Sequence, residues 1–191
     1  MGNRATLYRF RIELSDVDRG VYQPIDFRAA LHPSETPRYL LTRAIAYALN
    51  FQEGIEFAPG GISDTEEPAL RVKTMDGRTL EWIEIGNPST KKLHKASKSG
   101  AVVKVYAHKD PGQLVKELSD GDVHRKDEIE IYSLKASKES GEDFFERLEK
   151  MVERDNKWNL IFNEGSISIT SQSASGEKSA SAELRRHKLG D

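Results

Sequence analysis

The residue types best suited to chemistry lie between positions 64 and 98. Asp64 and Glu67 stand beside Pro68, Glu84 lies inside an apolar segment, and a lysine-rich segment follows. Two carboxylates can hold Mg²⁺ or Mn²⁺, and a lysine can stabilise the negative charge that develops at phosphorus. This order of residues predicts a metal-dependent phosphodiesterase. A chance order is the alternative, because 31% of the residues are charged.

A hairpin decides whether these carboxylates can meet. The pair Asp76-Gly77 favours a two-residue type I′ loop. That loop fixes three cross-strand pairs: Met75 with Arg78, Leu70 with Ile83, and Arg71 with Trp82. A four-residue loop gives the same register, whereas a three-residue loop would shift it. In this register Glu67 is a diagonal neighbour of Glu84, so both could reach one cation.

An ordinary structural role is the alternative for these acids. A carboxylate in a strand is commonly solvated or paired with a neighbouring cation such as Arg71. The strand that carries Glu84 is apolar on both faces, however, through Leu80, Trp82, Ile83 and Ile85. Such a pattern is typical of a central strand, where a carboxylate is costly to bury unless it is paired or bound to a metal.

Composition limits the class of protein. The chain has 191 residues, 37% of them hydrophobic, and no cysteine. No apolar run approaches the ~20 residues needed to cross a bilayer, and the first residues lack the apolar core of a signal peptide. We therefore expect a cytoplasmic protein with no membrane partner. The net charge of −2 gives no overall attraction to nucleic acid.

The charged residues are nevertheless distributed unevenly along the chain. Residues 91–109 contain six lysines and two histidines but no acid. A basic face of this kind can hold phosphates, and it predicts a nucleic-acid partner bound through Lys91, Lys92, Lys95 and Lys98. A solvated helix face is the alternative.

Periodicity places these residues on regular elements. It predicts strands over 5–14 and 21–31, a helix over 37–50, strands near 55–58, 67–75 and 78–86, a helix over 89–98, a strand over 101–107, a short helix from 111, a strand over 128–134, a helix over 141–154, and strands over 158–162 and 166–170. The class is α/β or α+β, with a mixed central sheet flanked by helices. We expect one domain over 1–171 and a C-terminal extension over 172–191 that forms a weak hairpin around Gly176-Glu177 or is partly disordered.

The sequence lacks the motifs of several other classes of enzyme. The sequence contains no HExxH, GxSxG, P-loop or GxGxxG pattern, so it predicts neither a serine nucleophile nor a nucleotide cradle. His32 precedes the first helix, where a capping or hydrogen-bonding role is the main interpretation and a catalytic base the alternative.

Several segments together resemble one known family. They are Asp16-Val17-Asp18-Arg19, His32-Pro33-Ser34-Glu35-Thr36, Glu66-Glu67-Pro68, Trp82-Ile83-Glu84-Ile85-Gly86 and Lys95-Ala96. The chain resembles the YaeQ proteins of Gram-negative bacteria, from the first hairpin to about residue 170. The resemblance implies a core related to the PD-(D/E)xK nucleases: a helix, a three-stranded meander, a second helix and a further strand. Members of the family are described as of unknown function, and a fold does not establish an activity.

The resemblance also implies roles for particular acids. Glu67 would be the first motif acid, with Asp64 or Glu66 as substitutes, although Pro68 follows the acid here instead of preceding it. Glu84 would be the second acid. Asp64, Glu67 and Glu84 would then be the metal ligands.

The motif lysine is missing from its usual place. It would stand two residues after the second acid, where this chain has Gly86. A lysine from the next helix could replace it, with Lys95 as the first choice and Lys92 as the second. Glu35 would be the additional first-helix carboxylate that supports the metal or orients the attacking water.

Three functions follow from the sequence. The first is a Mg²⁺- or Mn²⁺-dependent, nuclease-like phosphodiesterase that uses Glu35, Glu67, Glu84 and Lys95. The second is a catalytically inactive module that kept the fold and binds nucleic acid or protein through residues 91–109. The third is a structural or interaction domain whose acids only pair with nearby cations.

Overall fold

The computed structural model describes residues 4–59, 66–136 and 141–190. Contacts within the chain group it into two compact units. Unit 1 comprises Met1–Leu49 and Leu134–Arg185, and unit 2 comprises Asn50–Ser133 and Arg186–Asp191. None of the helices in the described segments is long and apolar enough to cross a bilayer.

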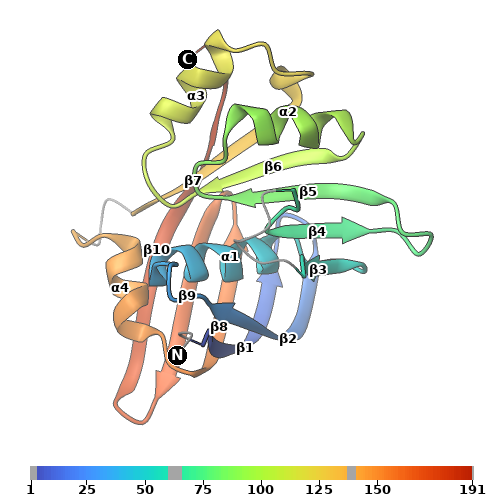
Figure 1. Ribbon diagram of the computed structural model, residues 1–191. Coiled ribbons are helices and arrows are strands. Elements are labelled where there is room, and N and C mark those ends of the chain that lie inside the picture. Colours follow the sequence, from blue (N-terminus) through green and yellow to red (C-terminus); the bar gives the residue numbers. More distant parts are fainter. Residues whose placement is uncertain (1–3, 60–65, 137–140, 191) are drawn as a thin grey trace. The chain divides into compact units, whose positions relative to one another are not determined.

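Unit 1 is built on a mixed sheet (Figure 1). Its strands run in the order β2-β1-β8-β9-β10. β1 pairs with β8 in parallel, and the other neighbours are antiparallel. The elements are β1 (Thr6–Asp16), β2 (Val21–Leu31), α1 (Pro37–Leu49), α4 (Phe144–Met151), β8 (Asp155–Asn163), β9 (Ser166–Ser173) and β10 (Gly176–His187). The last two residues of β10 belong to unit 2.

The core of unit 1 follows from alternation along its strands. Phe10, Ile12 and Leu14 are buried, whereas Arg9 and Arg11 point to the other face and pair with exposed carboxylates. Phe10 stacks on Phe27 at 5.3 Å between ring centroids. The apolar side of α1 packs against β1, β2 and α4, so the helix closes this face of the sheet.

The β1–β2 turn is held by buried charge. Asp16 is 1% exposed, and its carboxylate accepts hydrogen bonds from the backbone N–H of Arg19 at 3.0 Å and from Arg19 Nε at 2.6 Å. Arg19 also donates to the carbonyl of Ala48 at the end of α1. Asp18 accepts hydrogen bonds from the backbone N–H groups of Glu164 and Gly165. The acidic turn noted in the sequence therefore has a structural role in unit 1.

Asp16→Ala is expected to lower the free energy of unfolding by about 2 kcal/mol, because it removes a buried carboxylate that accepts two hydrogen bonds from Arg19. Chemical denaturation monitored by tryptophan fluorescence measures this change. Asp26→Ala is the matched control, because Asp26 forms an exposed ion pair with Arg9, and it should leave the midpoint almost unchanged. Equal losses in the two variants would contradict the role given to Asp16.

Unit 2 combines a second mixed arrangement of strands with two helices. The strand order is β7-β6-β5-β4-β3, with β5, β6 and β7 parallel and β3, β4 and β5 antiparallel. The elements are β3 (Ile55–Phe57), β4 (Leu70–Lys73), β5 (Thr79–Ile85), α2 (Thr90–Lys98), β6 (Val102–Ala107), α3 (Gly112–Asp120), a 3₁₀ turn (Lys126–Glu128) and β7 (Glu130–Ala136). β7 ends within unit 1.

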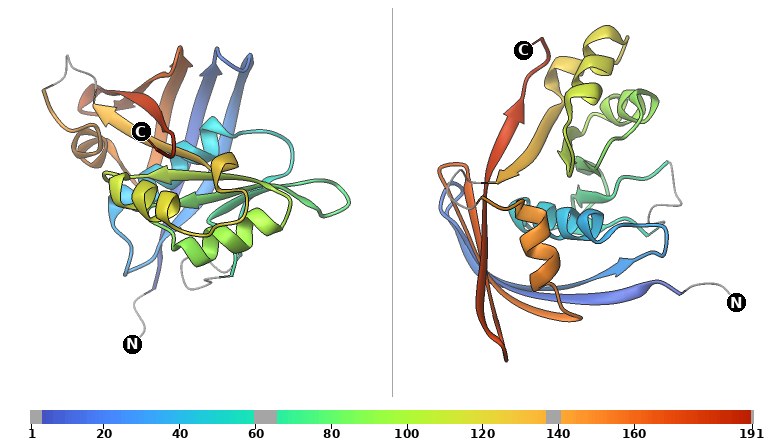
Figure 2. Two further views of the ribbon diagram at one scale, coloured as in Figure 1. Left: turned by 90° about the horizontal axis from the view of Figure 1, so that it is seen from above. Right: turned by 90° about the vertical axis from the view of Figure 1, so that its left-hand side faces the viewer.

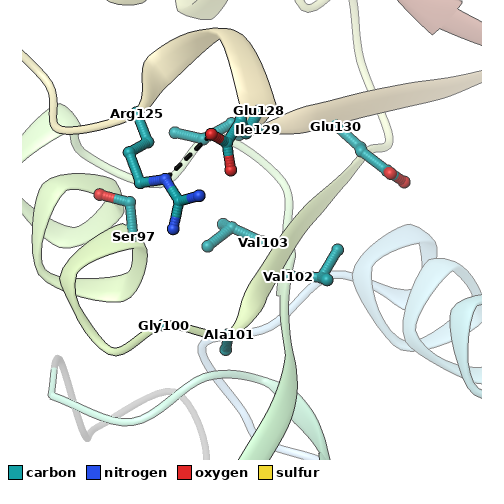
Figure 3. Close-up of a pocket in the computed structure, with 9 residues that line it drawn as sticks. All are labelled: Ser97, Gly100, Ala101, Val102, Val103, Arg125, Glu128, Ile129 and Glu130. Carbon is teal, nitrogen blue, oxygen red and sulfur yellow. Dashed lines mark hydrogen bonds and ion pairs between the residues drawn. The ribbon is translucent and has the colours of Figure 1, made fainter.

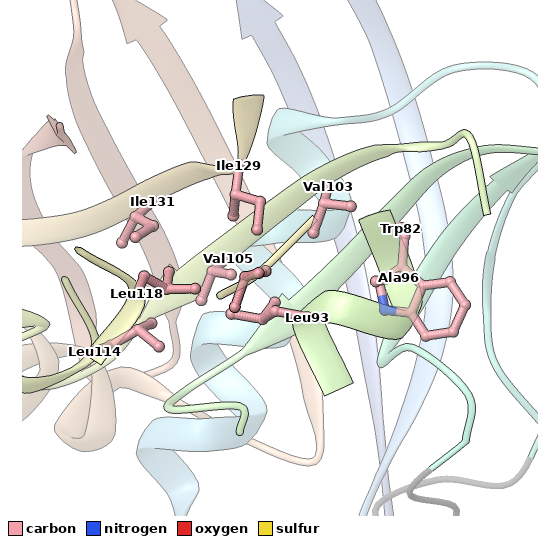
Figure 4. Close-up of a cluster of buried hydrophobic side chains, with 10 residues drawn as sticks. Trp82, Leu93, Ala96, Val103, Val105, Leu114, Leu118, Ile129 and Ile131 are labelled. Carbon is pink, nitrogen blue, oxygen red and sulfur yellow. The ribbon is translucent and has the colours of Figure 1, made fainter. Parts of the chain in front are cut away.

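The helices α2 and α3 contact each other and cover one face of β5, β6 and β7 (Figure 2). The core beneath them is entirely apolar apart from the indole of Trp82 (Figure 4). Leu93 and Ala96 come from α2, and Leu114 and Leu118 come from α3. The spacing of these residues along each helix fixes which helical face turns to the sheet.

The predicted α+β class with a mixed sheet is confirmed, and the predicted elements recur within a few residues of their expected ends. The predicted pairs of Leu70 with Ile83 and of Arg71 with Trp82 are also confirmed.

The turn of this hairpin was predicted wrongly. Gly77 has a φ of +85°, but Asp76 does not have a positive φ, so the type I′ loop is not formed. The backbone N–H of Thr74 instead donates to the carbonyl of Arg78, which closes a three-residue loop. Such a loop shifts the register by one residue, and an irregularity between Val72 and Lys73 restores it further along the hairpin.

The tail forms a hairpin with the preceding strand. β10 pairs with β9 from Gly176 opposite Ser173 to Glu183 opposite Ser166. The turn is therefore at residues 174–175 and not around Gly176-Glu177. The division into a domain over 1–171 and an extension over 172–191, like the cytoplasmic location, stays a prediction.

Candidate functional site

Glu84 is the buried carboxylate around which a site can be built in unit 2. It lies near the end of β5 and is 4% exposed. Its Oε1 accepts a hydrogen bond from Trp82 Nε1 at 2.7 Å and lies 3.1 Å from Lys92 Nζ. A buried acid, a lysine and an indole N–H therefore converge at one point.

The start of α2 explains why Lys92 reaches this acid. Ser89 caps the helix, and its side chain accepts a hydrogen bond from the backbone N–H of Lys92. The next residue, Leu93, is fully buried in the core beneath the helix. With the cap and the buried leucine both fixed, the side chain of Lys92 lies beside the end of β5. This lysine was only the second choice from the sequence.

Burial governs the protonation of Glu84. Desolvation raises the pKa of its carboxyl above the ordinary value of 4.5, while the charge of Lys92 and the hydrogen bond from Trp82 oppose that rise. A raised pKa in a buried acid with a defined cation partner is typical of functional sites, although structural ion pairs also produce it.

The structure also explains why no lysine stands two residues after Glu84. Gly86 has a φ of +84°, a region that side chains other than glycine rarely adopt. A Cβ at this position would lie 3.1 Å from Cε1 of His108. A side chain at position 86 would thus be strained by the backbone conformation and crowded by the His108 ring, and the lysine that contacts Glu84 comes from α2.

Glu67, the acid predicted to come first in the motif, is already paired. Glu67 Oε2 lies 2.5 Å from Arg71 Nη1, and Arg71 Nε also donates to Glu56 at 2.6 Å. Glu66 forms an ion pair with Lys95. Lys95, the first choice as catalytic lysine, therefore contacts Glu66, while Lys92 contacts Glu84. Because the two lysines are three positions apart on α2, they occupy successive turns of the same helix face.

Two other predicted residues do not belong to the described part of unit 2. Asp64 lies outside the described residues. Glu35 belongs to unit 1, where its side chain is 1% exposed and lies 3.5 Å from Arg43 Nη1. Its other oxygen accepts a hydrogen bond from the backbone N–H of His32. These contacts give Glu35 a structural partner within its own unit, and its catalytic role stays a prediction.

No group of three or more acids or histidines placed to hold a metal ion occurs among the described residues. Glu84 is nonetheless a ligand of the right type, because Mg²⁺ is often held by one or two carboxylates together with water and substrate phosphates. The predicted metal ligands therefore stay predictions.

The basic segment divides into exposed and occupied lysines. Lys91 and Lys98 are exposed on α2 and form no hydrogen bond or ion pair within the described part of the chain. Lys104 instead donates to Glu81 and Asn50, both at 2.9 Å. The face open to a polyanion is thus formed by α2, and Lys104 does not belong to it.

A pocket of about 360 Å³ lies at the start of β6 (Figure 3). Arg125 lines it and donates to Glu128 at 2.9 Å. Glu130 adds a second acid to the lining, so acids outnumber cations there. This balance is unfavourable for a phosphate ligand.

The chain matches the family model described as YaeQ protein over residues 1–179. It is 30% identical over 108 residues to "Uncharacterized protein YaeQ" of Escherichia coli (strain K12), and 28% identical over 108 residues to the protein of that name from Salmonella typhi. Each match covers 56% of this chain and 59% of the relative, so the chain spans less than two thirds of the curated relatives it matches.

Solved structures agree over a longer range. The crystal structure of YaeQ protein from Pseudomonas syringae has a TM-score of 0.73 and 28% identity, and the match covers 95% of both chains. The YaeQ protein from Xanthomonas axonopodis pv. citri has a TM-score of 0.72 and 23% identity, over 95% of this chain and 98% of that one. The second likeness concerns the fold alone. With a family match over 179 of its residues, this chain belongs to the YaeQ family.

Proposed function

We propose that unit 2 carries a nuclease-like site that hydrolyses phosphodiesters with Mg²⁺ or Mn²⁺, in an arrangement related to the PD-(D/E)xK enzymes. The observation that supports this proposal is the buried Glu84 paired with Lys92 from the following helix. The order β3, β4, β5, α2, β6 matches the meander, second helix and further strand of such a core, and α1 precedes them in the chain.

The residues divide the work as follows. Glu84 is the principal carboxylate ligand, and the second comes from the segment before β4, where Glu66, Glu67 and Asp64 are the candidates. The bound cation would supply Lewis-acid stabilisation of the phosphate. Lys92, which lies beside Glu84, would stabilise the negative charge of a bound phosphate. The hydrogen bond from Trp82 holds the Glu84 carboxylate in place throughout.

A cleavage assay tests this proposal. Single- and double-stranded DNA and RNA are incubated with Mg²⁺ or Mn²⁺ and with wild type, Glu84→Gln or Glu128→Gln. We expect Glu84→Gln to lose at least about a hundredfold in rate, the usual scale for removing a group that stabilises transition-state charge. Glu128→Gln removes an exposed acid outside the site and should cleave normally. Metal-dependent cleavage that persists in Glu84→Gln would contradict the assignment.

The ion pairs formed by the acids favour a second function. Glu84, Glu67 and Glu66 each have a cation partner, whereas Lys91 and Lys98 of α2 remain exposed. This distribution supports a catalytically inactive module that binds nucleic acid through α2. Its binding would need no metal and would weaken steeply with salt. An affinity that does not change with salt would exclude this function.

A further inference from the structure

A groove on unit 2 lies between α3 and the segment 186–190. Its volume is about 430 Å³. On the helix side the lining residues are Gly112, Val115, Lys116 and Ser119, which form one stripe of α3. On the opposite side the lining residues come from the segment 186–190.

Two contacts fix the terminal segment in place. Leu189 packs against the apolar core under α2 and α3. The ring of His187 is 2.7 Å from the hydroxyl of Ser133 on β7, from Nε2 to Oγ. The segment is therefore held by packing on one side and by a hydrogen bond on the other, and the groove wall is formed in the free protein.

The charge of the groove is mainly positive. Among the residues that the structure describes, its lining contains three permanent cations, Lys116, Arg186 and Lys188, and one carboxylate, Asp110. Asp110 accepts a hydrogen bond from the backbone N–H of Gly112 at 2.9 Å.

The cations of the groove form few contacts with the described residues. Lys116 and Lys188 form no hydrogen bond or ion pair with any residue that the structure describes. Arg186 Nη2 is 3.8 Å from Glu130 Oε1, which is too long for a hydrogen bond. Many other arginines of the chain, among them Arg9, Arg11 and Arg71, are paired at hydrogen-bond distance. Three exposed cations with few partners among the described residues therefore gather at this groove.

We propose that this groove binds the phosphate group of an anionic ligand. A guanidinium can clasp two phosphate oxygens, and lysines add point charge on either side. The volume lies within the range of small-molecule sites, and Val115 adds an apolar side chain to the lining. The phosphate can belong to a nucleotide-sized molecule or to a nucleic-acid backbone. The proposal does not depend on Glu84 or Lys92.

Isothermal titration calorimetry tests this site on the full chain. The probes are inorganic phosphate, adenosine monophosphate and a short single-stranded DNA. We expect the double variant Arg186→Gln/Lys188→Gln to bind the phosphate-bearing probes at least about tenfold more weakly, because it removes charge-assisted hydrogen bonds. Arg185→Gln is the matched control, since Arg185 is adjacent in the chain, pairs with Glu183 and does not line the groove.

The outcomes separate the alternatives. Binding of adenosine monophosphate that is lost in the double variant supports a small phosphorylated ligand, and binding of DNA alone that is lost in the same way supports a nucleic-acid backbone. No binding of any probe, unchanged binding in the double variant, or an equal loss in Arg185→Gln would overturn the proposal. The double variant leaves Glu84 and Lys92 unchanged, so its loss of binding is independent of the cleavage assay. Thermal melting of each variant verifies that it is folded.

Discussion

Lys92→Met is expected to lower the free energy of unfolding by about 2–3 kcal/mol near neutral pH. Lys92 is the cation partner of Glu84, and the methionine would leave a buried carboxylate with the indole N–H of Trp82 as its remaining partner. Removing one partner of a buried ion pair costs about 3–5 kcal/mol. The Lys92 side chain is 20% exposed, so we take a smaller value. Urea denaturation at several pH values measures the change.

The pH dependence gives this prediction a sign. Burial raises the pKa of Glu84 above 4.5, so the folded chain binds this proton more tightly than the unfolded chain. The contribution of Glu84 to the free energy of unfolding therefore falls as the pH rises from 4.5 through the raised pKa. Lys92 opposes the rise in pKa, and without it the fall becomes larger and extends to higher pH. Lys92→Met should therefore be most destabilising at neutral pH and nearly neutral below pH 4.5.

Lys95→Met is the control for this experiment. Lys95 is three residues further along α2, and both it and its partner Glu66 are largely exposed. Exposed ion pairs contribute little, so the variant should change stability by less than about 1 kcal/mol. Equal effects of the two substitutions, or an effect of Lys92→Met that does not depend on pH, would show that the Glu84–Lys92 pair is not a buried charge pair.

Gly54→Ala is expected to destabilise unit 2 by at least about 3 kcal/mol. Gly54 precedes β3 with a φ of +86°, and a Cβ there would lie 2.0 Å from the carbonyl oxygen of Lys73. The carbonyl of Gly54 also accepts a hydrogen bond from the backbone N–H of Lys73. A left-handed conformation costs a residue other than glycine about 1–2 kcal/mol, and a clash with backbone must move β3 away from β4 as well.

Gly77→Ala separates these two causes. Gly77 has nearly the same φ, +85°, but nothing lies within 4 Å of a Cβ built on it. Gly77→Ala should lower the free energy of unfolding only by the cost of the left-handed conformation, about 1–2 kcal/mol. Thermal and urea unfolding of both variants measure the difference. A loss in Gly54→Ala no greater than in Gly77→Ala would mean that the contact with Lys73 relaxes without cost.

The sequence was sufficient for the local structure. Alternation predicted β1 and β2, and the 3.6-residue period predicted α1 and α2, because burial of one face depends on side-chain type and spacing alone. The register of Leu70 with Ile83 was predicted from a two-residue loop at Asp76-Gly77, and that loop does not form. The predicted pairing is nevertheless correct, because the three-residue loop at Gly77 is compensated by the irregularity near Val72. Because these two register shifts cancel, the pattern of apolar residues along the strands reveals neither of them.

The sequence by itself determined which residues could do chemistry in unit 2: a lone acid in an apolar strand and a following helix rich in lysine. Tertiary structure decided which lysine meets Glu84. Lys92 and Lys95 are equivalent in type and lie on one helix face, but the cap at Ser89 and the burial of Leu93 set the position and rotation of α2. Tertiary structure also placed the basic end of the chain beside α3, because the docking of Leu189 is a long-range contact. The spacing of apolar residues along the chain indicates which side of a helix or strand is buried. Contacts between residues of different elements, such as Glu84 with Lys92, depend on how those elements pack.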